Sequence, residues 1–132
     1  MLKRILMIAL VLTAVTATTA FAGSTFQTTC SEVQFAYGSG NTATITAKCL
    51  NSAGTAVSSS LTLNGISNQS GKLVQGSGAS TFQQSCGNIQ IQVVDSSNVN
   101  LTALCRTSSG SSSSTSLPLN GISNQNGKLV QN

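Results

Sequence analysis

The chain contains one sequence twice, and this internal duplication constrains its fold more than any other feature. Residues 24–75 and 80–131 align without a gap at an offset of 56, and 26 of the 52 paired positions carry the same residue. Two copies of one sequence are expected to build two related structures about an approximate twofold axis. The match is densest in the tails, 61–75 and 117–131, and weakest between the cysteines of each copy.

The segment before the copies, residues 1–22, has the features of a secretory signal peptide. Lys3 and Arg4 give a basic start, an apolar run follows over 5–15, and Ala20-Phe21-Ala22 is a small-x-small cleavage box. The apolar run is shorter than the roughly 20 residues that span a bilayer. We therefore expect cleavage after Ala22 and a secreted, periplasmic or extracellular location, with no membrane insertion of the mature chain.

The mature part, 23–132, is expected to fold as one domain, because a 52-residue repeat buries too little surface to stand alone. Its charges nearly balance, with four basic side chains and two acidic ones: Lys48, Lys72, Arg106 and Lys128 against Glu32 and Asp95. No basic cluster with interleaved aromatic residues suggests a nucleic-acid partner. The chain has no His, one Asp and one Glu, so neither catalysis nor a cofactor is expected.

Four cysteines lie in the mature part, Cys30 and Cys49 in the first copy and Cys86 and Cys105 at the same separation in the second. Four cysteines allow three pairings. An ancestral single repeat would have joined Cys30 to Cys49, and duplication then predicts a bond between Cys86 and Cys105. An oxidising destination favours disulfides over zinc, and the absence of His excludes a mixed zinc site. Each bond should contribute about 3 kcal/mol of stability.

Alternation of apolar and polar residues predicts strands between the cysteines. In the first copy, Val33, Phe35 and Tyr37 precede a turn at 38–41, after which Ile45, Ala47 and Cys49 alternate. The second copy keeps this period with different residues around a turn at 95–98: Ile89, Ile91, Val93, Val99, Leu101, Ala103 and Cys105. Each copy is therefore expected to form a hairpin.

A second, shorter hairpin is expected in each tail. After a loop rich in Ser and Gly, Leu61 and Leu63 begin a short strand, Asn64-Gly65 interrupts it, and a turn over 67–71 leads into a strand at 72–75. Pro118 marks its stretch as an edge strand or an irregular segment. The chain is therefore predicted to be all-β.

These elements, in this doubled order, resemble the cyanovirin-N homologues, a family of small lectins with two tandem repeats. The resemblance is carried by a Phe four residues before the first Cys of each copy (Phe26, Phe82), one Cys pair per copy, and a Leu-x-Leu-Asn…Ile-x-Asn-x-x-Gly-x-Leu tail at 61–73 and 117–129. It implies that the copies exchange strands to give two pseudo-symmetric halves. Each half would hold a three-stranded sheet, a hairpin and short helical turns.

The resemblance also implies two metal-independent sites for high-mannose oligosaccharides or glycoproteins, with terminal α-1,2-linked mannose preferred. The first site would comprise Thr25, Thr28, Thr29, Asn51, Ser52, Asn124 and Asn126. The second would comprise Asn68, Ser70, Ser80, Thr81, Gln84, Ser85, Arg106, Thr107 and Ser108.

The sequence departs from the family pattern at several of these positions. Ser70 and Asn126 stand where the family carries acidic acceptors, and Leu50 follows Cys49 where it carries a charged residue. Charge-assisted hydrogen bonds are about twice as strong as neutral ones, so weaker or altered sugar binding is expected. Useful strength would then come from engaging two branches of one glycan.

Two alternatives to the lectin interpretation are open. The shared Asn and Gly of the tails are also what tight turns require, and a secreted structural or protein-interaction module with the same fold would bind no sugar. We expect a monomer, with a domain-swapped dimer as the alternative because the copies are joined by the glycine-containing linker 76–79. In a eukaryotic source, Asn68 and Asn100 would lie in glycosylation sequons.

Overall fold

The computed structural model describes residues 23–132, so the expected signal peptide lies outside the described residues. The described chain is built from antiparallel strands and short 3-10 turns, which confirms the all-β prediction. The strands are β1 (Cys30–Tyr37), β2 (Ala43–Leu50), β3 (Ala56–Thr62), β4 (Asn64–Gln69), β5 (Lys72–Ala79), β6 (Cys86–Val93), β7 (Val99–Arg106), β8 (Ser112–Pro118), β9 (Ile122–Gln125) and β10 (Lys128–Gln131). The 3-10 turns are η2 (Phe26–Thr28), η3 (Ser39–Asn41) and η4 (Phe82–Gln84).

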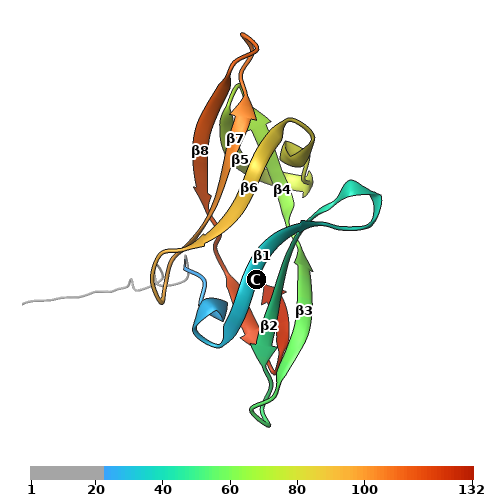
Figure 1. Ribbon diagram of the computed structural model, residues 1–132, viewed down its shortest axis with the longest axis vertical. Helices are drawn as coiled ribbons and strands as arrows, with labels where there is room; N and C mark the ends of the chain where they lie inside the picture. The colour runs from blue at the N-terminus through green and yellow to red at the C-terminus, as the bar shows by residue number, and fades with distance from the viewer. Residues whose placement is uncertain (1–22) are drawn as a thin grey trace, which may run out of the picture.

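The molecule consists of two pseudo-symmetric halves (Figure 1). The first half contains η2, the sheet β1-β2-β3 and the hairpin β9-β10; the second contains η4, the sheet β6-β7-β8 and the hairpin β4-β5. Each hairpin therefore packs on the sheet of the other copy. Hydroxyl groups of each sheet accept hydrogen bonds from the hairpin that packs on it. The Leu129 N–H donates to Ser59 Oγ at 2.9 Å, and the Leu73 N–H donates to Thr115 Oγ1 at 3.1 Å. The expected exchange of strands is confirmed.

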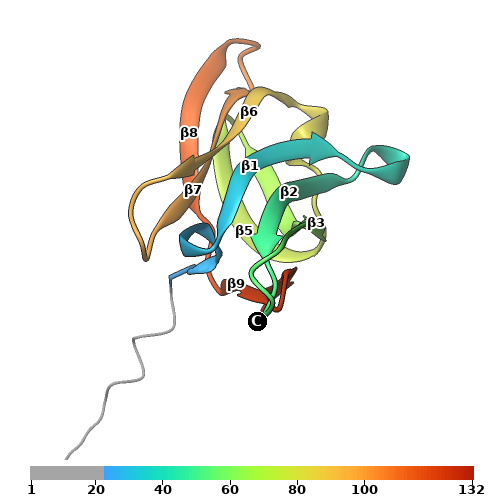
Figure 2. The ribbon, with the colours of Figure 1, turned by 60° about the horizontal axis from the view of Figure 1, so that its bottom comes forward.

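The core follows the alternation of the central strands. Ile45, Ala47 and Cys49 of β2 are buried, as are Val99, Leu101, Ala103 and Cys105 of β7. Phe26 and Phe82, fully buried, lie in the 3-10 turns that precede the sheets. Phe35 and Phe82 pack edge to face with ring centroids 6.0 Å apart, which joins the two halves where β1 and β6 approach each other (Figure 2).

The start of each copy is fixed to the other copy by one buried serine. Ser24 Oγ donates to the Leu119 carbonyl at 2.6 Å and accepts from the Ile122 N–H at 3.1 Å. Ser80 Oγ donates to the Leu63 carbonyl at 2.7 Å and accepts from the Ile66 N–H at 3.0 Å. Because each hydroxyl both donates and accepts a hydrogen bond, these serines stabilise the exchanged arrangement at little desolvation cost.

The disulfides and the strand bounds test several of the sequence predictions. The disulfides join Cys30 to Cys49 and Cys86 to Cys105, as predicted. The prediction of a loop before Leu61 is wrong, because 56–62 forms β3, and the equivalent stretch 112–118 of the second copy forms β8. Residues there alternate between exposed and partly buried positions, and pairing with β2 and β7 overrides the weak strand preference of Ser. Pro118 ends the edge strand β8, as predicted.

The linker between the copies is also more regular than predicted. Residues 76–79 belong to β5, where Ala79 pairs with Asn64 across an irregularity at Gly65. Gly65 has φ +78°, and an added Cβ would meet the Gly76 carbonyl. In the described part of the chain, no helix has the length and apolar character needed to cross a membrane.

Candidate functional site

The tip of hairpin β4-β5 is attached to the second copy through Asn68. Its Nδ2 donates to the Arg106 carbonyl at 3.0 Å and to Ser85 Oγ at 2.9 Å. Its Oδ1 accepts from the Gly71 N–H within the turn at 2.7 Å. One amide therefore joins a hairpin tip, the end of β7 and the residue before β6.

Asn124 repeats this arrangement in the first half. Its Nδ2 donates to the Leu50 carbonyl and to Thr29 Oγ1, both at 2.9 Å, and its Oδ1 accepts from the Gly127 N–H at 2.7 Å. Both amide hydrogens of Asn68 and of Asn124 are thus used by the scaffold. The two residues shape the candidate sites, and most of their hydrogen-bonding capacity is taken before any ligand arrives.

The hairpin loop of each tail begins two residues after this asparagine. Ser70 and Asn126 have φ of 50° and 54°, and Gly71 and Gly127 have φ of 91° and 90°. Two residues with positive φ are typical of a type I′ turn, which explains the Gly and favours Asn at the first position. Ser70 Oγ accepts from the Ser108 N–H at 3.1 Å, and Asn126 Oδ1 accepts from the Ser52 N–H at 2.6 Å. The loops therefore also touch the turns that follow β2 and β7.

Those turns are stiffened by their own side chains. Asn51 Oδ1 accepts from the N–H groups of Ala53 and Thr55, both at 3.0 Å. Thr107 Oγ1 lies 2.9 Å from the hydroxyls of Ser109 and Ser111. Within these two clusters, five predicted residues have side-chain groups with no hydrogen-bond partner within 23–132: the Ser52 hydroxyl, the amide nitrogens of Asn51 and Asn126, the Gln84 amide and the Arg106 guanidinium.

Not every predicted residue joins these two clusters. Ser80 is buried, with only 7% of its surface exposed, and its hydroxyl bonds the backbone of β4 and of the residue before it. Thr25 lines a different hollow, together with Ser123. The Thr28 hydroxyl donates to the Thr25 carbonyl at 2.8 Å. Thr81 is exposed, and its backbone N–H donates to the Ile66 carbonyl at 2.9 Å.

A shallow hollow of about 390 Å³ lies beside the second cluster. It is lined by three predicted site residues, Gln84, Ser85 and Arg106. Five other residues line it that the sequence analysis did not assign to a sugar site: Cys86, Gly87, Asn88, Leu104 and Ser112. Asn88 sits at an irregularity of β6 with φ of 50°. A bulge of this kind has no regular sequence signal, so the apolar-polar alternation that predicts the strand does not reveal it.

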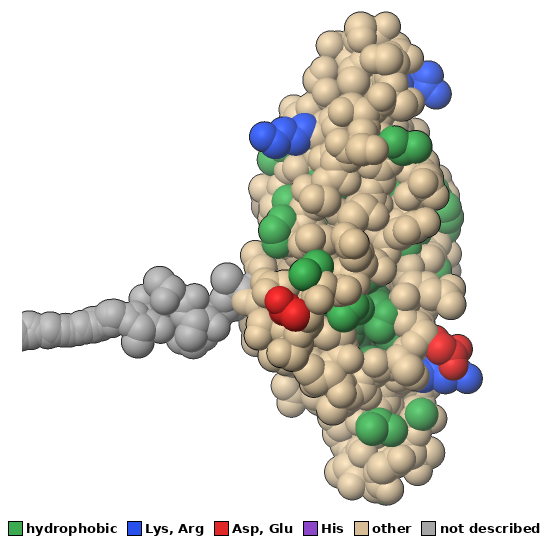
Figure 3. Space-filling model, turned by 60° about the vertical axis from the view of Figure 1, so that its left-hand side comes forward, with side chains coloured by type: hydrophobic (Ala, Val, Ile, Leu, Met, Phe, Trp, Pro, Cys, Tyr) green, Lys and Arg blue, Asp and Glu red, His purple; other side chains and the backbone are tan. Residues whose placement is uncertain are grey.

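Charge is sparse on the face shown in Figure 3. One ion pair is formed within the described chain, an exposed contact of 3.9 Å between Lys48 Nζ and Glu32 Oε2. Asp95 lies in the turn between β6 and β7, where the Ser97 N–H and then the Asn98 side chain hold the pKa of its carboxyl below the usual value of 3.8. The clusters around Asn68 and Asn124 themselves contain no carboxylate.

Comparisons with a family model and with solved structures agree on one family. The family model for the CVNH domain matches residues 26–130. TbCVNH from T. borchii is 28% identical with a TM-score of 0.60, over 82% of this chain and 99% of that chain. Microvirin in complex with mannobiose is 26% identical with a TM-score of 0.61, over 83% of this chain and 99% of that chain. No curated protein sequence gives a match.

Proposed function

The chain belongs to the CVNH family, and from this membership we propose that it is an exported lectin without catalytic activity that binds mannose-containing glycans. Terminal α-1,2-linked mannose is the proposed ligand, bound without metal at one site in each half. The similarity to microvirin, whose structure contains mannobiose, supports a mannose-type ligand.

The observation that carries the proposal is the pair of equivalent polar clusters at the two exchanged hairpin tips. Sugar hydroxyls both donate and accept hydrogen bonds, so they are matched by hydroxyl and amide groups on a stiff framework. In the first half, Thr29, Ser52 and Asn126 present such groups, and in the second Ser70, Ser85 and Gln84 do so. Asn68 and Asn124 position them.

Metal-independent binding is proposed because the sequence offers few metal ligands. It has no His, its cysteines are in disulfides, and its two acidic side chains lie on β1 and on the β6–β7 turn. Neutral hydroxyls and amides are weak ligands for most divalent ions when no carboxylate accompanies them. We therefore expect EDTA to leave binding unchanged.

The position of the sites suggests how they would be used. Figure 1 shows the β2–β3 turn at one end of the molecule and the β7–β8 turn at the other, and each proposed site includes one of these turns. Two sites at opposite ends are suited to joining two glycans. We therefore propose bridging between glycans in place of the expected engagement of two branches of one glycan.

A titration with α-1,2-mannobiose, followed by backbone amide NMR shifts, tests the proposal. We expect saturable shifts at both clusters, in buffer with or without EDTA. Ser52→Ala combined with Asn126→Ala should remove the shifts in the first half alone. Ser58→Ala, an exposed hydroxyl on the outer face of β3, is the control that should leave both sites intact.

The other candidate is a protein-interaction module with the same fold. It is favoured by the extent to which Asn68 and Asn124 serve the scaffold, because the repeated tail is then explained without a ligand. If no mannose-containing glycan binds at millimolar concentration, the lectin proposal fails and this module takes its place.

A further inference from the structure

We propose that the second half binds acidic saccharides more tightly than neutral ones, with Arg106 binding a carboxylate on the sugar, whereas the first half has no such preference. This inference rests on the proposed lectin function and assigns a ligand class to its second site. It comes from a difference between two sites that the duplication would otherwise make alike.

The difference appears when equivalent positions of the two copies are compared. Arg106 replaces Leu50, Asn88 replaces Glu32, and Leu104 replaces Lys48 at the offset of 56. In the first half Glu32 and Lys48 offset each other across 3.9 Å, next to the uncharged Leu50. In the second half one positive charge is left without a negative neighbour. Lys72 and Lys128 are equivalent to each other and do not distinguish the halves.

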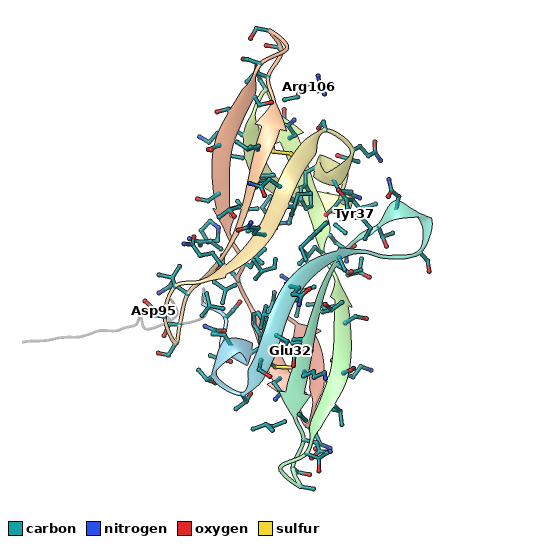
Figure 4. The ribbon with its side chains drawn as sticks, viewed as in Figure 1. Glu32, Tyr37, Asp95 and Arg106 are labelled. Carbon is teal, nitrogen blue, oxygen red and sulfur yellow. A yellow bond between two sulfur atoms is a disulfide. The ribbon has the colours of Figure 1, made fainter. Side chains whose placement is uncertain are left out.

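Neither acidic side chain of the protein is available to Arg106. The sequence has two acidic side chains. Glu32 is engaged with Lys48 in the first half, and the Asp95 carboxylate accepts from the Ser97 N–H at 2.9 Å and from the Asn98 amide at 2.8 Å. Figure 4 shows Arg106 near one end of the molecule, away from both. Within 23–132 the guanidinium therefore has no ionic partner.

The surroundings of Arg106 suit an anionic ring substituent. Its backbone carbonyl accepts a hydrogen bond from Asn68, and Arg106 lines the hollow of about 390 Å³ with Gln84, Ser85, Asn88 and Ser112. Guanidinium binds carboxylate through two parallel hydrogen bonds, while the amides and hydroxyls around it match ring hydroxyls. A uronic acid presents both kinds of group on one residue.

The expected preference is moderate because Arg106 is exposed. Exposed ion pairs are weak, and charge-assisted hydrogen bonds add to them, so we expect roughly three- to tenfold tighter binding of the acidic sugar at low salt. The preference should shrink as ionic strength rises, because added salt screens exposed charges.

Two ligands that differ in one group provide the test: methyl α-D-mannopyranoside and its 6-carboxylate, methyl α-D-mannopyranosiduronic acid. Both are titrated at low salt while amide shifts of the two halves are followed separately. The variants are the reciprocal exchanges Arg106→Leu and Leu50→Arg. Each places the residue of one copy in the other, and the carbonyls that accept from Asn68 and Asn124 are kept. Arg106→Leu should lose the preference for the acid in the second half, and Leu50→Arg should create one in the first half.

Two results would overturn the inference in distinguishable ways. If the wild-type protein binds both ligands equally in the second half, or if Arg106→Leu keeps the preference for the acid, selection by Arg106 is wrong while the lectin proposal stands. If neither of these ligands nor α-1,2-mannobiose shifts any amide at millimolar concentration, the lectin proposal fails and this inference fails with it.

Discussion

At the scale of single residues, Asn68 and Asn124 connect the two copies. Each makes three hydrogen bonds, to its own turn, to the strand end after the second cysteine of a sheet and to the residue before the first. The asparagines therefore set the positions of the groups that a ligand would meet.

Asn68→Ala should detach one hairpin tip. We expect it to lower the free energy of unfolding by about 1–3 kcal/mol, since the Arg106 carbonyl and the Gly71 N–H lose their partner. Urea denaturation measures the change. Gln69→Ala is the matched control, because Gln69 is exposed and its side chain bonds only the Ser67 hydroxyl within the described chain. Equal effects of the two substitutions would show that Asn68 has no special structural role.

Asp95 is expected to make a small pH-dependent contribution to stability. Its pKa is lowered in the folded chain by the Ser97 N–H and the Asn98 side chain, so the contribution is present above about pH 4 and is lost as pH falls through the folded pKa. Thermal unfolding of the wild type and of Asp95→Asn between pH 7 and pH 2 measures it. The variant should show a smaller decline below pH 4, and parallel curves would contradict the assignment.

At the scale of elements, each three-stranded sheet is locked at one end by a disulfide between directly paired residues. Cys30 faces Cys49 across β1 and β2, and Cys86 faces Cys105 across β6 and β7. Both bonds close loops of the same sequence separation, 19 residues. The halves should therefore depend on their disulfides to a similar degree, although the strands between the cysteines differ in sequence.

Replacing one pair by serine, Cys30→Ser with Cys49→Ser or Cys86→Ser with Cys105→Ser, should lower the free energy of unfolding by about 3 kcal/mol. Guanidinium unfolding curves of both double variants, and of the wild type as reference, provide the measurement. A loss confined to one pair would mean that the two halves do not share one mode of stabilisation.

At the scale of the whole molecule, the exchange of hairpins makes the copies inseparable. Ser24 and Ser80 each bond backbone groups of the other copy, and Phe35 packs on Phe82 between the halves. Neither copy holds a complete half by itself. The same exchange puts one proposed site toward each end of the described chain.

Bridging of glycans follows from this placement. A monomer with two active sites should make a solution of mannan turbid, whereas the variant Ser52→Ala with Asn126→Ala should bind mannan through the second site and leave it clear. Light scattering records turbidity, and size-exclusion chromatography with mass measurement checks that both proteins are monomers. Turbidity caused by the monomeric variant would contradict a one-site-per-half arrangement.

The sequence by itself determined the features that repeat locally. Duplication predicted the twofold arrangement and the pairing of Cys30 with Cys49, and the period of two placed Ile45, Ala47 and Val99 in the core. These predictions depend on residues close together in the chain or on the equivalence of two copies, both of which can be read from one sequence.

The tertiary structure decided what depends on distant segments. It turned the Ser-rich stretch into β3, buried Ser80 between the copies, and used Asn68 to hold Arg106, 38 positions away. Small polar residues such as Ser and Asn have weak local preferences, so their roles are set by the backbone groups that folding brings to them. For the same reason, the sequence named many members of the two candidate sites, and only the fold showed which of their polar groups are unbonded.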